Sequence, residues 1–289
     1  MKKLIFISFL LSGSLFFSST GWADINSDFR TATIAYNRKD YRIAFGLLNK
    51  LAHQGHAIAQ YNLGVMYTNG QGVAQNDEQA AYWYQQAAEQ GNTLAQFNLG
   101  NMYDNGQGVT QDYEQAVNWY QKAAKQGNTL AQYNLGVKYN NGQGVIQNYK
   151  QAAYWYQKAA EQGYALAQNN LGNMHDNGQG VAKNYEQAVY WYQKAAEQGN
   201  ALAQYNLGLR YALGQGVIKN NVVAYALIKA SAIRDDNVKK AQNIISQQMS
   251  QEERTAGQDL SKQISQSGNL LSAVNEYLQK HSYPLIYLK

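Results

Sequence analysis

Asparagine and leucine side chains recur at fixed positions along the 289-residue chain, and they predict a surface that binds a peptide. Asn98 follows Leu94 by four residues and precedes Asn101 by three, so an α-helix would place all three on one face. An asparagine amide both donates and accepts hydrogen bonds, which suits an extended peptide backbone, and leucine adds apolar contact. The candidate protein-binding residues are Leu94, Asn98, Asn101, Leu130, Asn134, Val137, Leu166, Asn170, Asn173 and Asn206.

The same asparagines also have a structural interpretation. In this alternative, Asn98 and its equivalents bond to the turn of their own or of the next unit. The two interpretations stand side by side for the helical positions. A structural role is favoured for the turn residues Asn105, Asn141 and Asn177.

Other residue types that do chemistry give little signal. The chain has no cysteine, which excludes disulfides and thiol catalysis. His53 and His56 lie on either side of a helix-ending glycine, so they are not expected to share a metal. The N-G-Q-G-V segments lack the preceding strand and the lysine of a phosphate-binding loop. We therefore predict no catalytic, cofactor-binding or metal-binding residue.

The candidate residues belong to a sequence repeat. Its closing glycines fall at a constant interval of 36 residues, at Gly55, Gly91, Gly127, Gly163 and Gly199. Self-similarity at such a period is typical of stacked arrays in which each unit buries its face against its neighbours. The five predicted units are 56–91, 92–127, 128–163, 164–199 and 200–235.

Each unit is predicted to form two antiparallel helices. In the second unit they cover residues 93–104 and 113–126, with a turn between them. Asp112, with Gln115 three residues later, has the pattern of a capping box, and the closing glycine suits a left-handed helix end. The predicted core residues are Ala95, Leu99, Tyr103, Ala116, Trp119, Tyr120, Ala123 and Ala124, and Gly100 is expected to admit a neighbouring backbone.

The two ends of the chain differ from the repeats. Residues 1–23 have two lysines, an interrupted apolar run and small residues before Asp24, which is typical of a cleaved signal peptide. The run is shorter than the roughly 20 residues that span a bilayer. Residues 24–55 are predicted to form an N-terminal capping helix pair, with helices over 28–37 and 40–53. Residues 236–289 are predicted to form a helical cap, whose tail either completes the cap or tethers the protein.

The charge balance gives further bounds. The chain has 24 Lys plus Arg and 19 Asp plus Glu, and loss of Lys2 and Lys3 would leave 22 minus 19, or +3. This small, scattered excess argues against a nucleic-acid partner. No later stretch is apolar enough to span a membrane. We expect a soluble, exported monomer in the periplasm or outside the cell.

The repeated motif resembles that of a known family. A-x-x-Q-[YF]-N-L-G-x-x-Y, then N-G-x-G-V, then Q-A-x-x-W-Y-x-x-A-A-x-Q-G, is similar to the Sel-1-like repeat (SLR), a relative of the tetratricopeptide repeat. The resemblance implies an all-α fold, an α/α solenoid that winds as a right-handed superhelix. It also implies an adaptor or scaffold, which in secreted bacterial members serves host interaction, signalling or envelope assembly. The family has no catalytic motif to carry over.

The fourth unit departs from the motif at two places. Asn169 and His175 occupy positions where other units have aromatic residues, such as Phe97 and Tyr103. Tolerated drift in a redundant array is one explanation, and a softened binding spot is the other.

Two functions from different classes follow. The first is a non-catalytic scaffold that binds a protein or peptide in a groove lined by the first helices. The alternative is an envelope β-lactam-binding protein or a β-lactamase-like enzyme, because some cysteine-rich relatives have been linked to that activity. This chain lacks their cysteines and shows no replacement nucleophile.

Overall fold

The structure of the protein is a computed structural model that describes residues 19–267 and 270–283, with side chains from Ser27 onward except Ser267. Most of the predicted signal peptide 1–23 and the apolar end around Pro284 lie outside these residues.

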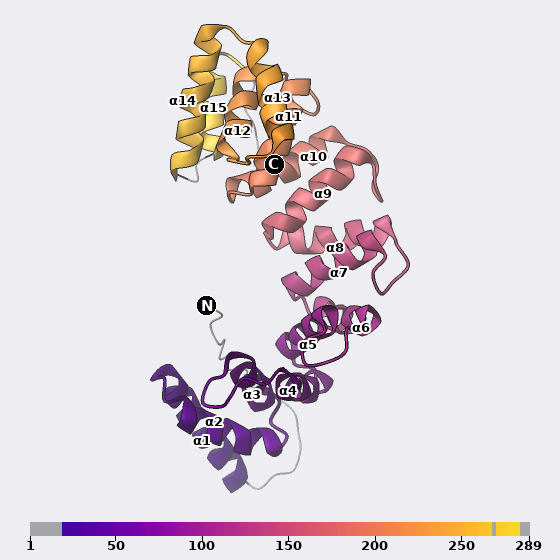
Figure 1. Ribbon diagram of the computed structural model, residues 1–289, viewed down its shortest axis with the longest axis vertical. Coiled ribbons are helices and arrows are strands. Elements are labelled where there is room, and N and C mark those ends of the chain that lie inside the picture. Colours follow the sequence, from indigo (N-terminus) through magenta and orange to yellow (C-terminus); the bar gives the residue numbers. More distant parts are fainter. Residues whose placement is uncertain (1–18, 268–269, 284–289) are drawn as a thin grey trace. The chain divides into compact units, whose positions relative to one another are not determined.

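The described residues form fifteen α-helices and contain no strand (Figure 1). In chain order the helices are α1 (Ser19–Asn37), α2 (Tyr41–His53), α3 (Ala57–Asn69), α4 (Asp77–Glu89), α5 (Thr93–Asn105), α6 (Tyr113–Lys125), α7 (Thr129–Asn141), α8 (Tyr149–Glu161), α9 (Ala165–Asn177), α10 (Tyr185–Glu197), α11 (Ala201–Leu213), α12 (Asn221–Ala230), α13 (Asp236–Gln247), α14 (Gln251–Ser267) and α15 (Leu270–Lys280). The predicted all-α repeat fold is confirmed.

The chain divides into two compact units. The first comprises the residues up to Ala131 together with Gln143–Val145, and the second comprises Gln132–Gly142 together with the residues from Ile146 onward. In the first unit α1 to α6 pack on their chain neighbours, and in the second α8 to α12 do the same (Figure 1). The boundary between the two compact units passes through α7.

The N-terminal helix pair differs from its prediction in two respects. Helix α1 begins at Ser19 rather than at residue 28. On α2, the three- and four-residue spacing of apolar residues predicts a core stripe that includes Ile43, but Ile43 is 56% exposed. The core positions are Ala44, Leu48 and Leu51, a narrower stripe that leaves the Ile43 side of the helix in solvent.

Each second helix begins with the predicted side-chain cap but without the complete capping box. Asp112 Oδ1 accepts hydrogen bonds from the backbone N–H groups of Glu114 and Gln115, at 2.9 and 3.0 Å. The backbone N–H that Gln115 would bind in a capping box donates instead to the Tyr103 carbonyl at 2.9 Å. This bond ties the two helices of the hairpin together.

The glycines of the long turn have separate roles. Gly106 ends α5 in the left-handed conformation at φ 68°. Gly108 lies against the start of α4, where an added Cβ would fall 2.1 Å from the Asp77 carbonyl oxygen. Only glycine permits that approach, so this turn is also a contact with the preceding repeat.

The core largely follows the sequence pattern. Ala95, Leu99 and the predicted residues of α6 are buried. Tyr103 is only half-buried, and Met102 is buried in its place at 6% exposure. At Gly100, an added Cβ would lie 3.4 Å from the Ala116 backbone oxygen of α6, as predicted, and only 2.7 Å from Cδ1 of the Tyr120 ring, which is the closer contact.

The recurring tryptophans are not equivalent. Trp83, Trp119 and Trp191 are 5%, 7% and 8% exposed, which agrees with a packing role. Trp155 is half-buried.

Helices α13 to α15 follow the repeats. Ser250 and Glu253 form a complete capping box at the start of α14, with Ser250 N donating to Glu253 Oε2 at 2.8 Å and Glu253 N donating to Ser250 Oγ at 3.2 Å. Helix α14 packs on α12, and α15 packs on α14 and contacts α10. Leu270, Val274 and Leu278 of α15 belong to the core of this region.

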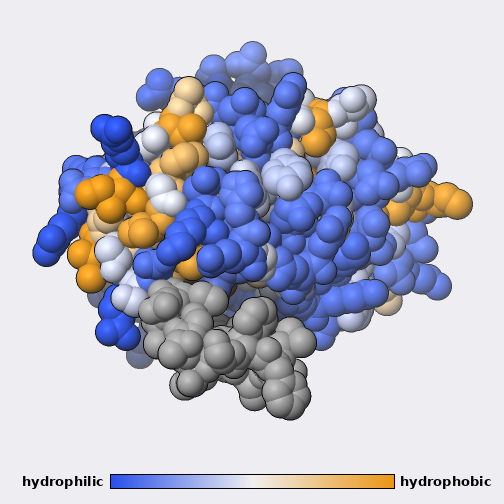
Figure 2. Space-filling view, turned by 90° about the horizontal axis from the view of Figure 1, so that it is seen from below, coloured by the Kyte–Doolittle hydropathy of each residue, from blue (hydrophilic) through white to orange (hydrophobic). Residues whose placement is uncertain are grey.

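The visible surface is mainly polar. In Figure 2 most of the exposed residues are hydrophilic and the hydrophobic ones form small groups. Among the described residues, no helix combines the length and the apolar character needed to cross a membrane.

Candidate functional site

The predicted binding leucines lie at the second residue of the first helix in their repeats. Leu130 on α7 and Leu166 on α9 are both 42% exposed, and Leu202, the equivalent residue on α11 outside the predicted set, is 55% exposed. Leu94 on α5 and Val137 on α7 are half-buried.

The predicted asparagines lie between helices of successive repeats. The Asn98 side chain is within hydrogen-bonding reach of the Tyr61 and Tyr84 hydroxyls of the repeat before it. Burial raises the pKa of both tyrosines, and the contact with Asn98 works in the opposite direction. In the second compact unit, the Asn170 side chain is likewise within hydrogen-bonding reach of the Tyr133 and Tyr156 hydroxyls.

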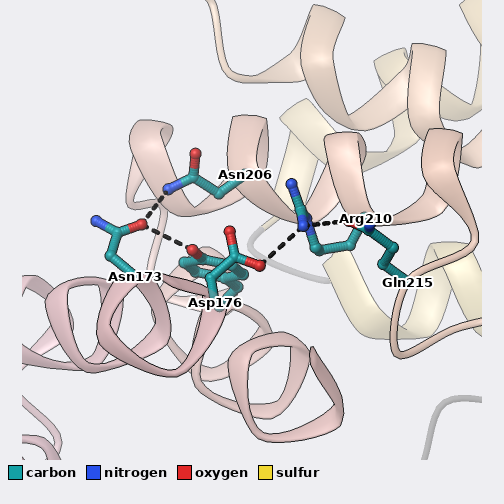
Figure 3. A network of polar contacts seen from close by, with 6 residues as sticks. Asn173, Asp176, Asn206, Arg210 and Gln215 are labelled. Atoms are coloured by element: carbon teal, nitrogen blue, oxygen red, sulfur yellow. Dashed lines mark hydrogen bonds and ion pairs between the residues drawn. The ribbon is translucent and has the colours of Figure 1, made fainter. Parts of the chain in front are cut away.

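The asparagines of α9 and α11 form a connected network (Figure 3). Asn173 Oδ1 accepts from the Tyr192 hydroxyl at 2.7 Å and from Asn206 Nδ2 at 3.1 Å. Asn206 Nδ2 also lies 3.2 Å from Asn169 Oδ1. Asn169 replaces an aromatic residue and supplies an acceptor to the next repeat, so it forms part of this contact rather than a gap in the packing.

The remaining predicted asparagines also have partners. Asn101 on α5 accepts from the Tyr120 hydroxyl at 2.8 Å, as Asn173 does from Tyr192. Asn134 takes part in an interaction as well. The Asn173 and Asn206 amides therefore hold neighbouring helices through bonds to Tyr192 and to other asparagines, and Asn101 accepts from Tyr120.

An ion pair extends the network toward the long turn of the fifth repeat. Arg210 donates to Asp176 Oδ1 at 2.8 Å and to Gln215 Oε1 (Figure 3). The side chains of Arg210 and Asp176 are 12% and 17% exposed, so water screens the pair only weakly. Burial raises the pKa of Tyr192, the Asp176 charge adds to this rise and the Arg210 charge opposes it.

The first repeat lacks the corresponding contact. Asn62 is fully buried, yet neither of its amide atoms has a hydrogen-bond partner. The residue one repeat before Tyr84 is Leu48, so the helix before α3 presents an aliphatic side chain where later repeats present a ring with a hydroxyl.

Pairs of hydrogen-bonded glutamines, called the glutamine relay, also join the repeats. They were not predicted from the sequence. Gln60 Nε2 donates to the Ala52 carbonyl of the preceding helix at 3.1 Å, and Gln90 Nε2 donates to Gln60 Oε1 at 2.7 Å. The same relay recurs at Gln96 with Gln126, at Gln132 with Gln162, and at Gln168 with Gln198. The constant 30-residue spacing between paired glutamines was the available signal.

His175 occupies a partly buried position at the end of α9. Its Nδ1 is buried without a partner. Burial lowers the pKa of the imidazole, and a hydrogen bond with the Ala182 backbone acts in the opposite direction. Within the described residues, no group of three or more His, Asp or Glu side chains gathers as metal ligands.

Hairpins of constant length, glycine turns and a polar contact repeated between neighbours define a helical-repeat protein. The Sel1 repeat model matches residues 38–56, 57–92, 93–128, 129–164, 165–200 and 201–236. These matches cover more than half of the chain, which belongs to the Sel1 repeat family. Proteins of this family are generally scaffolds for protein interaction.

Two solved structures are similar over most of the chain. A Sel1 repeat protein from Oxalobacter formigenes is 31% identical, with a TM-score of 0.64 over 87% of this chain and 99% of that protein. A protective antigen present in uropathogenic Escherichia coli strains, with an SLR fold, is 30% identical, with a TM-score of 0.58 over 93% of this chain. The chain spans 66% of the length of that antigen. No curated protein matches the chain.

Proposed function

We propose that the chain is an exported, non-catalytic scaffold that binds a protein partner along the first helices of its repeats. The observation that carries this proposal is the exposure of leucine at one repeat position. In the second compact unit, Leu166 and Leu202 are 42% and 55% exposed, whereas Leu171 and Leu207 on the same helices are 1% and 0% exposed. An apolar residue held in solvent at the same site of successive repeats suits contact with a partner.

The asparagines have a different part in this proposal. Asn173 and Asn206 link α9 to α11, so they fix the spacing between Leu166 and Leu202. A partner then meets leucines whose separation is set by the repeat. Replacing these asparagines would weaken binding through loss of alignment.

The test is capture of the partner by crosslinking in native cells, followed by identification of the captured protein. A Leu166→Asp, Leu202→Asp variant is expected to lose capture and to keep its circular dichroism spectrum. Ile218→Asp is the matched control, because Ile218 is 57% exposed and lies in a turn outside the stripe. Capture of the partner by the leucine variant at the wild-type level would contradict the proposal.

Export is the second part of the proposal, and it is supported by the lysine-led apolar N-terminus of the sequence. Cleavage before Asp24 would remove Ser19–Ala23, the first turn of α1. N-terminal sequencing of the protein recovered from the periplasm or medium should begin at Asp24. A chain that retains Met1 in the cytoplasm would contradict export.

A further inference from the structure

A strip of side chains on α10 is covered although it faces away from the hairpin. Tyr190, Gln193, Lys194 and Glu197 have the i, i+3, i+4, i+7 spacing of one helix face. Gln193 is 2% exposed and its Nε2 is buried without a partner, and the other three are half-buried. Burial also raises the pKa of Glu197.

Helix α10 contacts α15 as well as its chain neighbours α9 and α11. Leu270, Val274 and Leu278 of α15 share one buried cluster with Val189 and Tyr192 of α10. The second helix of the fourth repeat thus already carries an amphipathic helix from outside the repeats. The shared cluster consists of hydrophobic residues, so apolar contact is the main force that holds α15 there.

The same strip on α8 is open. Residues 154–161 and 190–197 both read Y-W-Y-Q-K-A-A-E, so the two helices offer identical side chains. On α8, Tyr154, Gln157, Lys158 and Glu161 are all exposed, Tyr154 by 50%. The difference between the two strips is one of coverage and not of chemistry.

The α8 strip also exposes aromatic rings. Tyr154 and Trp155 meet edge to face with ring centroids 4.9 Å apart, and Trp155 is half-buried. The ammonium group of Lys158 lies 5.8 Å from the centre of the Tyr154 ring. Aromatic pairs of this kind anchor protein interfaces, because they supply large contact area with few rotatable bonds.

The corresponding strips on α4 and α6, in the first compact unit, lack part of this combination of residues. On α4, Tyr82 is 51% exposed, but Trp83 is buried and Gln86 stands in the lysine position. On α6, Asn118 replaces the tyrosine. The complete combination of open tyrosine, half-open tryptophan and lysine therefore occurs on α8.

We infer that the α8 strip, formed by Tyr154, Trp155, Gln157, Lys158 and Glu161, is a docking site for an amphipathic helix of a partner protein. The fitting helix has apolar residues spaced like Leu270, Val274 and Leu278 of α15, because α15 contacts α10, whose strip has the same sequence and is covered. The chain's own α15 is buried in its cap and is therefore not the occupant. This surface is separate from the leucine stripe of the first helices, so either can fail without the other.

A labelled peptide tests the inference. The probe is fluorescein-labelled residues 270–283, added to the full-length protein and followed by fluorescence anisotropy. We expect saturable binding that Tyr154→Ala weakens about tenfold or more, as for an interface anchor. Tyr82→Ala is the matched control, with the same residue type and 51% exposure, and should leave binding unchanged. A peptide carrying Val274→Asp should not bind.

Four results would overturn the inference. The first is no saturable binding up to about 1 mM peptide, the limit of weak specific recognition. The second is an equal loss in Tyr154→Ala and Tyr82→Ala. In the third, Tyr190→Ala changes binding and Tyr154→Ala does not, which would show exchange with α15 on α10. In the fourth, light scattering finds a dimer that Tyr154→Ala dissociates, which would make the occupant a second copy. Circular dichroism of each variant verifies folding.

Discussion

The first and fifth repeats surround the same asparagine in opposite ways. Asn62 of α3 is fully buried with both amide atoms unpaired, whereas Asn206 of α11 bonds to Asn173 at 3.1 Å and to Asn169 at 3.2 Å. The sequence around each asparagine is nearly the same. What differs is the preceding helix pair: α9 supplies Asn169 and Asn173 to Asn206, whereas neither amide atom of Asn62 finds a partner on α1 or α2. The hydrogen bonds of the recurring asparagine thus depend on the preceding repeat and not on its own helix.

The two interfaces consequently rest on different forces. The N-terminal pair meets the first repeat through a cluster of apolar residues that includes Leu48, Leu63, Met66 and Trp83. Helices α9 and α11 meet through amides and an ion pair. Substitutions should therefore rank differently at the two places.

The largest effect is expected at the apolar interface. Trp83→Ala should lower the free energy of unfolding by about 3 to 5 kcal/mol, because a nearly buried indole leaves a cavity. Trp155→Ala, at a half-buried ring, should cost about half as much. Chemical denaturation measures both, and a loss below about 1 kcal/mol for Trp83→Ala would show that this ring does not hold the cap.

A smaller loss is expected at the ion pair. Arg210→Met installs the residue found at this position in α3, α5 and α9, yet leaves the Asp176 carboxylate without its partner. With side chains 12% and 17% exposed, the expected loss is about 2 kcal/mol, below the value for a fully buried pair. The double variant Arg210→Met, Asp176→Asn should regain most of it. Equal stability of the single variant and the wild type would show that the ion pair does not stabilise this interface.

The smallest effect is a dependence on pH. The folded pKa of His175 is lowered by burial, so between that value and the unfolded value near 6.5 the unfolded chain binds more protons. Stability should therefore fall as pH drops below about 6.5. His175→Tyr should reduce this fall, and the part that remains is assigned to His56, whose pKa is also lowered by burial. An unchanged slope of unfolding free energy against pH would contradict this assignment.

Much of the fold followed from local signals. The 36-residue period, the cap at Asp112 and the glycine after each second helix located the hairpins to within a residue or two, because these signals act within a few residues along the chain. The incomplete capping box escaped prediction because the Tyr103 carbonyl takes the Asp112 N–H from nine residues away. Competition for a donor of that kind is decided by the fold.

The candidate site was less predictable for a related reason. Spacing placed Leu166, Asn170 and Asn173 on one face, but it gave no account of what lies across from that face. The tyrosines that meet the asparagines come from a different helix, and the covering of α10 by α15 joins residues about 80 positions apart. Identical strips on α8 and α10 show the limit most clearly, since sequence alone would assign them one environment.

The most direct test of the account is the stability of two leucine variants at the same repeat position. Asn62→Leu removes an unpaired buried amide and should stabilise the protein by about 1 kcal/mol or more, whereas Asn206→Leu removes two contacts of the network and should destabilise it by about 2 kcal/mol. Urea denaturation of both variants gives the two differences. Changes of opposite sign in the free energy of unfolding would support the conclusion that the preceding repeat supplies the asparagine's hydrogen bonds. Equal losses of stability in the two variants would contradict it.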